Sequence, residues 1–466
     1  MADLLAKLFR SIPWGGAVTL GAVTFAAVTL SALALGATVA SRALAQGFDL
    51  RSLFSFPSTS AVTQPATGTT DWSGESGASG HPAMQADAIR AAAANFRSCL
   101  EELWPYAARR GVTRADFDAQ TAGLTPDLRI MDFLDAQPEF TKAPWEYLDT
   151  LVSDARIETG RKLLAQYRAT FDAVEKAYGV DRHYIAAIWG VESNYSTAIG
   201  ERSVVRSTAT LACIGRRQDF FREEFLSVLE IIGRGDLRPE QLKGSWAGAF
   251  GPTQFMPTSF KRYAVDFDGD GRRDVVDSIP DLIASTANNL KKDGWVTGQS
   301  WGYEVVLPQG FNYLNADRAR MLTLREWERA GVRRVGGKAF PRADDKAYLM
   351  VPAGAQGPAF VMLQNFSVIM KYNPAEAYAM AIGHLGDRLR GGEPFAQPWP
   401  RHERVLSRAE RYEMQQLLAQ QGYDTGEPDG RLGPKSRNAL RAFQAAVGAV
   451  PDGFASATIL DRLRAR

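Results

Sequence analysis

The sequence has little cysteine and little histidine. Two Cys and four His occur among 466 residues. Two cysteines exclude a disulfide-dense scaffold and any cysteine-rich zinc module, and they leave open either one disulfide, Cys99–Cys213, or two buried thiols. The histidines lack the spacing of ligand motifs such as HExxH, which argues against a histidine-based metal site. An enzyme of this composition would work mainly with carboxylates, amides and aromatic side chains.

The sequence also lacks an excess of charge of one sign. Lys and Arg total 54 against 52 Asp and Glu, a formal net charge of +2. This excess is too small to suggest a nucleic-acid partner or an anionic membrane surface. No GxGxxG follows a predicted strand, so a nucleotide-binding fold has no support, and no repeat of about 20–50 residues is visible. The hydrophobic content of 45% is that of a globular protein.

Residues 1–45 predict an export segment. Lys7 and Arg10 form a positive start, residues 11–41 carry no charge, and Ala43-Leu44-Ala45 is a small-x-small cleavage site. The uncharged run is also long enough to span a membrane, so an uncleaved inner-membrane anchor is the alternative to a signal peptide. We therefore expect a periplasmic protein. Disulfides persist in oxidising compartments, so export favours the Cys99–Cys213 bridge.

Composition divides the rest of the chain. Residues 46–82 are rich in Ser, Thr, Gly, Pro and Ala, which predicts a flexible linker. Residues 83–392 alternate amphipathic helical patterns with Gly-containing turns and predict a helical domain. Closely spaced prolines predict a second linker at 393–404, and 405–466 form a separate small unit. The predicted fold class is mostly α.

One carboxylate lies on an apolar helix face. Residues 180–195 predict a helix with Asp181 as its N-cap. Glu192 shares a face with Ile185, Ile188 and Trp189 at helical spacing. Burial disfavours the ionised form, so we expect a raised pKa, which suits a general acid near neutral pH. The alternative is a structural Glu at the frayed end of a core helix.

Residues 244–260 are rich in Gly and small residues, interrupted by aromatics and Gln254. Such sequence allows a ligand to approach the backbone closely, although a tight structural turn has a similar composition. An amide beside aromatic rings suits a sugar, whose hydroxyls form hydrogen bonds while its C–H faces pack on the rings.

Four motifs resemble, in order, those of the membrane-bound lytic murein transglycosylase B family, over roughly residues 83–392. They are WGVESNYS (189–196), GRRQDFF (215–221), GSWAGAFGPTQFMPTSF (244–260) running into YAVDFDGDGRRD (263–274), and MKYNPAEAYAMAIGHL (370–385). The resemblance implies a lysozyme-like, mostly helical catalytic domain that requires no cofactor. It implies cleavage of the β-1,4 bond between N-acetylmuramic acid and N-acetylglucosamine in peptidoglycan without hydrolysis, giving 1,6-anhydromuramic ends.

Carried over by motif, Glu192 resembles the family's single catalytic acid/base. The positions that the resemblance assigns to substrate binding are Ser245, Gln254, Phe255, Arg216, Arg217, Tyr372, Asn373 and Tyr378. The sequence departs from the family pattern at Ser196, where Gly is common, and at Pro252-Thr253, where a more Gly/Tyr-like pair is common. Both departures concern backbone geometry, so they bear on fine specificity more than on the reaction.

Two other functions remain open. A hydrolytic muramidase would need a second carboxylate about 5–9.5 Å from Glu192 to act as nucleophile or as base for water. A non-catalytic peptidoglycan-binding protein would keep the fold without the chemistry. The intact Glu192, Gln254 and arginine pair argue against this last reading.

The segment 266–277 is similar to the first half of an EF-hand loop. Asp occupies its first, third and fifth positions and Gly the sixth, but the twelfth is Asp rather than the usual bidentate Glu. Similar loops of this family can hold a cation. The alternatives are a structural Ca²⁺ and an Asp/Gly-rich surface turn. The candidate ligands are Asp266, Asp268, Asp270, Arg272, Asp277 and Asp281.

The last unit, 405–466, resembles the peptidoglycan-binding type 1 domain, a small three-helix module. Its marks are a helix over 413–423 with Gly422, a helix over 435–447, and the pairs Asp429-Gly430, Gly433-Pro434 and Asp452-Gly453. A helical cap on the catalytic domain is the alternative. A wall-binding module would raise the local concentration of a polymeric substrate, here peptidoglycan glycan strands.

Overall fold

The computed structural model describes residues 72–77, 79–135 and 143–466. The predicted export segment or anchor, residues 1–45 with the uncharged run 11–41, lies outside the described residues, as does the linker up to residue 71. Within the described part of the chain, no helix is both long enough and apolar enough to cross a membrane.

The end of the predicted linker is packed. Trp72 lies against the first hydrophobic core, and Ser73 Oγ donates a hydrogen bond to Asp132 Oδ1 at 2.6 Å. A short 3-10 helix, η1 (Pro82–Met84), leads into the first α-helix. Residues 72–77 and 79–82 therefore contact the helical domain, whereas the composition predicts a free tether there.

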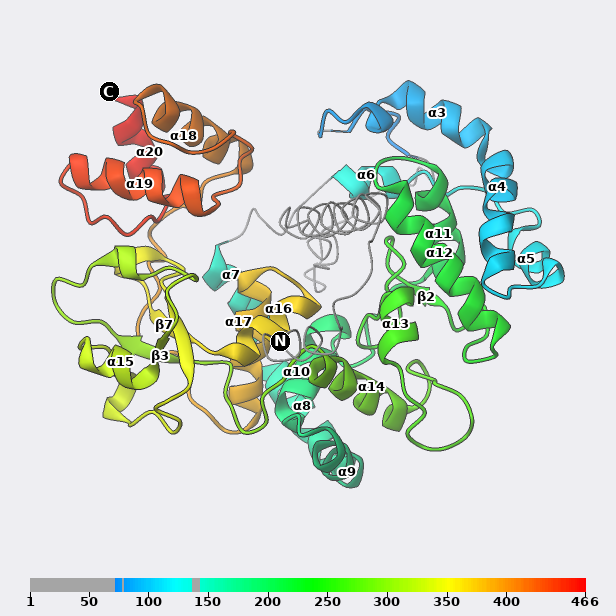
Figure 1. Cartoon of the computed structure of the whole chain (residues 1–466), viewed down its shortest axis with the longest axis horizontal. Coiled ribbons are helices and arrows are strands. Elements are labelled where there is room, and N and C mark those ends of the chain that lie inside the picture. The colour runs from blue at the N-terminus through cyan, green and yellow to red at the C-terminus, as the bar shows by residue number, and fades with distance from the viewer. Residues whose placement is uncertain (1–71, 78, 136–142) are drawn as a thin grey trace, which may run out of the picture. The chain divides into compact units, whose positions relative to one another are not determined.

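Helices dominate the chain as far as residue 292 (Figure 1). They are α3 (Ala86–Ala94), α4 (Phe96–Arg109), α5 (Arg114–Thr121), α6 (Ile130–Asp135), α7 (Pro144–Leu151), α8 (Asp154–Gln166), α9 (Arg168–Tyr178), α10 (Arg182–Ser193), α11 (Val204–Cys213), α12 (Gln218–Gly233), α13 (Pro257–Tyr263) and α14 (Ile279–Lys292). Two strands, β1 (Arg202–Ser203) and β2 (Lys243–Gly244), pair antiparallel. The predicted helix-dominated fold is confirmed.

The first core joins α4, α5, α11 and α12 around buried aromatics such as Phe117, Phe221 and Phe225. Cys99 on α4 and Cys213 at the end of α11 form a disulfide, with Cα atoms 5.9 Å apart. The bridge fixes the helix that carries the N-terminal part of this core against the hairpin of α11 and α12.

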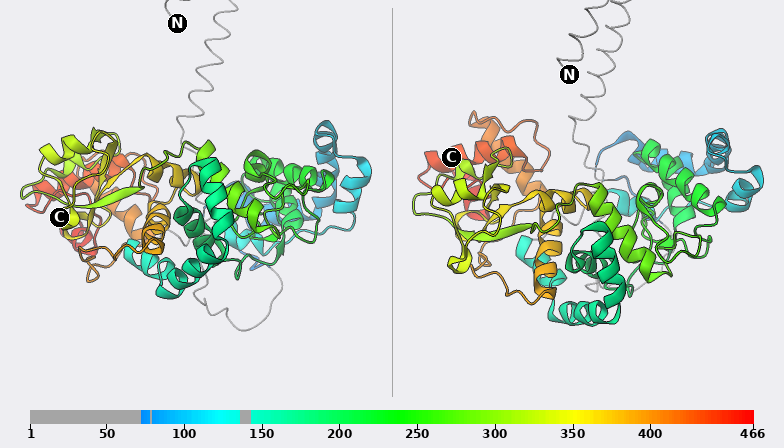
Figure 2. Two further views of the ribbon diagram at one scale, coloured as in Figure 1. Left: turned by 90° about the horizontal axis from the view of Figure 1, so that it is seen from below. Right: turned by 60° about the horizontal axis from the view of Figure 1, so that its bottom comes forward.

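The second core places α10 among α8, α9, α14 and α17 (Figures 1 and 2). Helix α17 (Glu376–Leu389) approaches α10 closely because it has glycine at the contact. A Cβ on Gly386 would lie 2.5 Å from Cδ1 of Tyr184 on α10, closer than packed atoms allow. Helix α16 (Gln364–Tyr372) precedes α17 and completes this side.

A five-stranded antiparallel sheet follows α14. The sequence analysis does not predict this sheet. Its order is β4-β6-β7-β3-β5, and Gly302 and Tyr348 both face Met362 in the register. The three longer strands are runs rich in aromatic and aliphatic residues, which suit a pleated surface that is at least half buried. The strands of the sheet are β3 (Gly302–Val306), β4 (Leu322–Thr323), β5 (Arg333–Arg334), β6 (Lys346–Met350) and β7 (Ala359–Met362). The segments between them contain α15 (Leu324–Arg329), η3 (Tyr313–Asn315), η4 (Val335–Gly337) and η5 (Gly354–Gln356).

The predicted second linker, residues 393–404, is also packed. The Phe395 ring stacks on His384 of α17 with centroids 3.8 Å apart. The backbone N–H groups of Ala396 and Gln397 donate to the carboxylate of Glu304 at 2.9 and 2.8 Å. The chain therefore reaches its last unit along the side of the sheet rather than through a free spacer.

The C-terminal unit has three helices and its own core. Helices α18 (Arg408–Gln420), α19 (Pro434–Ala446) and α20 (Ala457–Arg464) pack around Met414, Leu440 and Leu460. Ser407 and Glu410 form a capping box at the start of α18, which satisfies two backbone N–H groups there.

Candidate active site

Glu192 lies in the last turn of α10, between buried Val191 and Ser193. Its side chain is half-buried, so one side of it remains open to solvent. Tyr378, two residues into α17, donates a hydrogen bond from its hydroxyl to Glu192 Oε1 at 2.5 Å. The close contact of α10 and α17 thus brings together two residues that are 186 positions apart.

Burial raises the pKa of Glu192 to about 8, while the hydrogen bond from Tyr378 acts in the opposite direction. No charged group of the described chain contributes to this shift. A carboxyl with such a pKa is mostly protonated at neutral pH. It can therefore donate a proton there, as a general acid must.

The chain turns sharply after Glu192. Asn194, Tyr195 and Ser196 all have positive φ, at 48°, 56° and 73°. The Ser196 hydroxyl accepts a hydrogen bond from Trp189 Nε1 at 2.9 Å, and its backbone N–H donates to Ser193 Oγ at 2.9 Å. These bonds offset the strain of a left-handed residue with a side chain, which explains how Ser stands where Gly is common.

The glycine-rich segment folds into a tight loop beside this turn. Ser245 Oγ accepts a hydrogen bond from the N–H of Ala249 at 3.0 Å. Gln254 has a φ of 52°, and its Nε2 donates to the carbonyl of Ile199 at 3.0 Å, which ties the loop to the segment after α10. Its Oε1 is buried and accepts no hydrogen bond from the described residues. That oxygen is suited to receive a ligand hydroxyl.

Tyr372 and Asn373 hold the other side of the loop. The Tyr372 hydroxyl donates to the carbonyl of Thr253, and its ring lies edge-on to Phe255 with centroids 6.4 Å apart. Asn373 is buried, and its Oδ1 accepts a hydrogen bond from the N–H of Ala375 at the start of α17. The connection that leads to Tyr378 is thereby fixed to the loop that contains Gln254.

Arg216 and Arg217 occupy the connection between α11 and α12. Arg216 Nη2 donates to the carbonyl of Leu134 at 2.7 Å. The guanidinium of Arg217, whose φ is 66°, lies 4.7 Å from the ring centroid of Phe220. Their contacts lie in the first core, whereas the Glu192–Tyr378 pair belongs to the second.

Glu224 on α12 is a second buried carboxylate, which the sequence reading misses. Both of its oxygens accept hydrogen bonds from Thr258, from the N–H at 2.9 Å and from Oγ1 at 2.7 Å. Burial raises its pKa to about 7. It is 1% exposed, so it caps α13 rather than facing a substrate.

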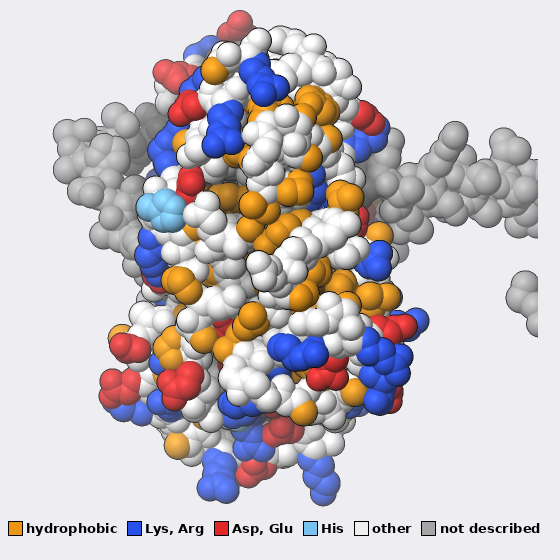
Figure 3. Space-filling view, turned by 90° about the vertical axis from the view of Figure 1, so that its left-hand side faces the viewer, with side chains coloured by type: hydrophobic (Ala, Val, Ile, Leu, Met, Phe, Trp, Pro, Cys, Tyr) orange, Lys and Arg blue, Asp and Glu red, His pale blue; other side chains and the backbone are white. Residues whose placement is uncertain are grey.

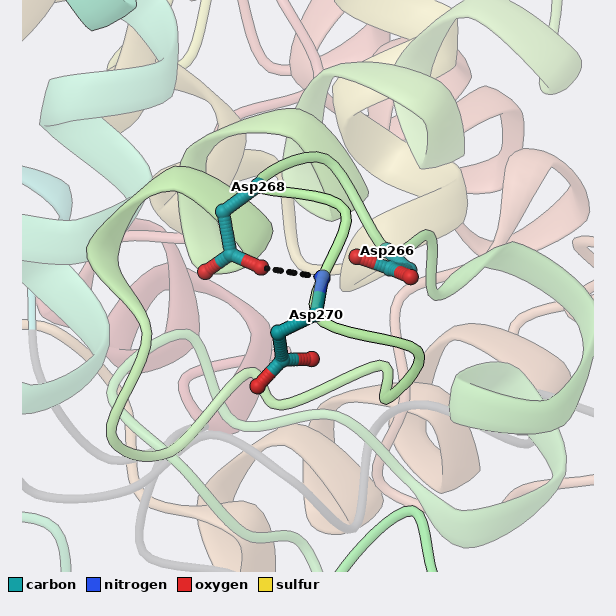
Figure 4. Close-up of side chains that lie close together, drawn as sticks. All are labelled: Asp266, Asp268 and Asp270. Carbon is teal, nitrogen blue, oxygen red and sulfur yellow. Dashed lines mark hydrogen bonds between the residues drawn. The ribbon is translucent and has the colours of Figure 1, made fainter.

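Three aspartates of the acidic loop come together. Carboxylate oxygens of Asp266, Asp268 and Asp270 lie within 4.8 Å of one another, and all three side chains are exposed (Figure 4). Asp268 Oδ1 also accepts a hydrogen bond from the N–H of Asp270 at 3.2 Å. This donor set fits an oxygen-preferring cation such as Ca²⁺.

The remaining predicted ligands point to other partners. Asp277 Oδ2 accepts from Gln241 Nε2 at 2.6 Å, and the guanidinium of Arg272 pairs with Asp270 at 3.0 Å. Asp281 is fully buried and accepts hydrogen bonds from backbone N–H groups, including that of Phe267 at 2.7 Å, so its side chain holds the loop backbone in place. Asp277 and Asp281 thus lie outside the carboxylate cluster, whereas Arg272, at the position that supplies a backbone carbonyl in an EF-hand loop, stays a prediction.

A helical domain with one protonatable carboxylate beside an amide- and aromatic-lined loop defines a lysozyme-like enzyme. The family model described as transglycosylase SLT domain matches residues 95–387, and that of a putative peptidoglycan binding domain matches residues 407–463. The chain belongs to the SLT transglycosylase family and is a lytic transglycosylase with a C-terminal peptidoglycan-binding domain.

Curated and solved relatives agree with this assignment. The chain is 31% identical over 284 residues to membrane-bound lytic murein transglycosylase B of Escherichia coli, which covers 58% of this chain and 76% of the relative. SltB3 of Pseudomonas aeruginosa, solved in complex with NAG-anhNAM-pentapeptide, is 43% identical with a TM-score of 0.77 over 79% of this chain and 99% of its own. Slt35 of Escherichia coli, solved in complex with calcium, is 26% identical with a TM-score of 0.54, covering 64% and 92%.

Proposed function

We propose that this enzyme cleaves the β-1,4 bond between N-acetylmuramic acid and N-acetylglucosamine in peptidoglycan, without water, to give 1,6-anhydromuramic ends. The observation that carries the proposal is that burial raises the pKa of the Glu192 carboxyl to about 8, so that it is mostly protonated at neutral pH, while the Tyr378 hydroxyl donates a hydrogen bond to it. Ser245, Gln254, Phe255, Tyr372 and Tyr378 would surround the sugar chain beside it, and the Oε1 of Gln254, which accepts no hydrogen bond from the described residues, would receive a hydroxyl.

Glu192 acts twice in the reaction. It first gives its proton to the glycosidic oxygen as the C1–O bond breaks, and the substrate's 2-acetamido carbonyl assists at C1. The resulting carboxylate is stabilised by the Tyr378 hydroxyl. It then takes the proton from the muramic C6 hydroxyl, whose oxygen closes on C1. Glu192 ends protonated, and no water is consumed.

A hydrolytic reaction would need a second carboxylate to activate water or to attack C1. Two carboxylates so close would raise each other's pKa, yet burial alone accounts for the raised pKa of Glu192 among the described groups. The SltB3 complex contains an anhydro sugar, which further supports the lytic outcome for this chain.

The reaction is tested by mass spectrometry of fragments that the protein releases from purified peptidoglycan, beside Glu192→Gln. We expect muropeptides lighter by one water than hydrolytic products, without new reducing ends, and their loss in the variant. Products with reducing ends would assign the enzyme to the hydrolases instead. Binding without release from either protein would indicate a wall-binding protein.

We further propose that Asp266, Asp268 and Asp270 hold a structural Ca²⁺. Their clustered oxygens fit the ion, and the calcium complex of Slt35 supports it. The ion would stabilise the loop between α13 and α14 and would take no part in the chemistry.

Residues 1–45 would direct export to the periplasm, either as a cleaved signal or as an anchor, and this location suits a wall substrate. The C-terminal unit would hold the enzyme on glycan strands and so raise its effective substrate concentration.

A further inference from the structure

A cavity of about 400 Å³ lies between the sheet and the C-terminal module. Residues 348–352, at the end of β6 and directly after it, form one wall and α19 the other, with Phe454 and Leu432 adding apolar surface. Figure 3 shows hydrophobic side chains gathered in the middle of the face on this side of the molecule, with charged side chains around them toward the edges. The cavity has the size of a small-ligand site.

Guanidinium groups line the cavity from both sides. Arg318 comes from the catalytic domain, and Arg437 and Arg441 lie one turn apart on α19. Glu376, the first residue of α17, pairs with Arg318 at 2.9 Å and with Arg437 at 3.6 Å. These two arginines lower the pKa of Glu376 even though its burial acts to raise it, so Glu376 stays ionised between them.

Arg441 is the least satisfied of these cations. It is 7% exposed, and it donates to the carbonyl of Ala316 at 3.0 Å and to Asn438 Oδ1 at 3.1 Å. Its Nε–H is buried and meets no acceptor in the described chain. Burial and the neighbouring Arg437 lower its pKa. Like charges at this helical spacing repel each other, and an anion between them would relieve that repulsion.

The acidic groups of the cavity do not balance the arginines. Arg411 adds a fourth cation to the lining, against Asp317, Glu376 and Asp452. Asp452 already accepts from Gln444 Nε2 at 2.8 Å and from the N–H of Ala355 at 2.8 Å. The lining therefore has four arginines against three carboxylates, and the Nε–H of Arg441 is a donor without an acceptor among the described residues.

We propose that this cavity binds a carboxylate of the peptide that peptidoglycan strands carry, as a second substrate site distinct from the residues around Glu192. Forked guanidinium groups match a carboxylate, and the apolar wall suits short alkyl side chains such as those of alanine. In strands that carry peptides the lactyl carboxyl of muramic acid is bound as an amide, so the glycan there offers hydroxyls and amides, and the peptide carries the free carboxylates. The inference rests on peptidoglycan being the substrate.

Binding is tested by titration calorimetry with the full chain carrying Glu192→Gln, so that no turnover occurs. The probes are NAG-NAM-pentapeptide, the free pentapeptide and the disaccharide NAG-NAG, which has no carboxylate. Arg437→Gln and Arg318→Gln remove one cation from each wall, and both side chains are about half exposed. Lys435→Gln is the matched control, because it removes one charge from the same helix outside the cavity.

We expect both arginine variants to weaken binding of the two peptide probes about tenfold, the usual effect of a lost hydrogen bond to a charged group. Binding of the disaccharide should not change, and Lys435→Gln should match its parent within about twofold. A photoreactive pentapeptide should label residues of the cavity in the parent protein.

Equal binding of the peptide probes by Arg437→Gln and Lys435→Gln, or labelling confined to residues around Glu192, would overturn the site. If only NAG-NAM-pentapeptide binds through the arginines, the site takes peptide attached to glycan; if the free pentapeptide binds as well, it takes the peptide alone. Failure of the wild-type enzyme to release anhydro products would refute the proposed function instead, and calorimetry of the inactive variant keeps the two outcomes apart.

Discussion

The hydroxyl of Tyr378 should set the upper pH limit of the reaction. It donates to Glu192 Oε1 at 2.5 Å and so lowers a pKa that burial raises. Tyr378→Phe keeps the ring in its buried place and removes only this hydrogen bond. A hydrogen bond to a charged acceptor contributes about 1.5–3 kcal/mol, which corresponds to about 1–2 pKa units at 1.36 kcal/mol each.

The sign of the change follows from the charge that the bond stabilises. Tyr378 stabilises the carboxylate, so its loss favours the protonated form and raises the pKa of Glu192 above about 8. The first step needs the protonated carboxyl, so kcat/KM should fall on the alkaline side at a pH about 1–2 units higher than in the parent. The plateau should also drop about tenfold, because the carboxylate formed in that step loses its partner.

The assay is release of anhydro-muropeptides from purified peptidoglycan between pH 5 and pH 10. Tyr372→Phe is the matched control, because it removes a tyrosine hydroxyl that donates to the carbonyl of Thr253 rather than to Glu192. Its alkaline limit should stay where the parent has it, whatever its effect on rate. An alkaline limit of Tyr378→Phe that stays in place or moves to lower pH would refute the reasoning.

Three further changes test other parts of the structure. Glu192→Gln should stabilise the fold relative to the parent increasingly as pH rises from about 4.5 to about 8, by up to about 5 kcal/mol, because in the parent the folded state keeps a proton that the unfolded chain releases; melting curves of the two proteins that differ equally at pH 4 and pH 9 would contradict this. Calcium added to chelator-treated protein should raise the melting temperature, and Asp268→Asn should remove most of that rise; calorimetry without heat would exclude the ion. Replacing both Cys99 and Cys213 by Ser opens a link between residues 114 apart and should lower the unfolding free energy by about 3–5 kcal/mol in denaturant titrations, whereas no change would show that the first core holds without the bridge.

Sequence periodicity places Glu192 on an apolar face, but the same rule also selects Glu224. Glu224 lies three residues after Phe221 and four before Val228, so it meets the criterion equally well. The structure separates the two by their partners. Thr258 occupies both oxygens of Glu224, whereas Glu192 has one tyrosine and an open side. These partners come from distant parts of the chain, so local periodicity could not distinguish a catalytic carboxyl from a helix cap.

Sequence spacing likewise predicts only part of the acidic loop, residues 266–277. Alternation along the chain correctly groups Asp266, Asp268 and Asp270, because residues in one tight turn are close by necessity. The closing ligand depends on a partner outside the loop. Gln241, 36 positions away, donates a hydrogen bond to Asp277, and the buried Asp281 accepts hydrogen bonds from backbone N–H groups. Spacing alone does not reveal such competition.

Composition and periodicity could not predict the sheet or the packing of the connecting segments, for another reason. Strands of two to five residues are too short to show a period, and they follow a long helical region. In residues 393–404, prolines correctly predict the end of a helix, but they do not predict whether the following segment packs on the domain. The stacking of Phe395 on His384 keeps this segment on the surface of the domain.

A single carboxyl that must act as acid and then as base needs a pKa close to the surrounding pH, because a stronger acid would be ionised before the first step and a weaker one would release its proton too slowly. Enzymes with two carboxylates separate these roles by pushing the two pKa values apart. Here burial and the Tyr378 hydroxyl act on one group in opposite directions, and their balance leaves the pKa of Glu192 near 8. The contact of α10 and α17 that produces this balance also makes the ionised state unfavourable for folding, so the same geometry that permits one residue to serve both steps reduces stability at alkaline pH.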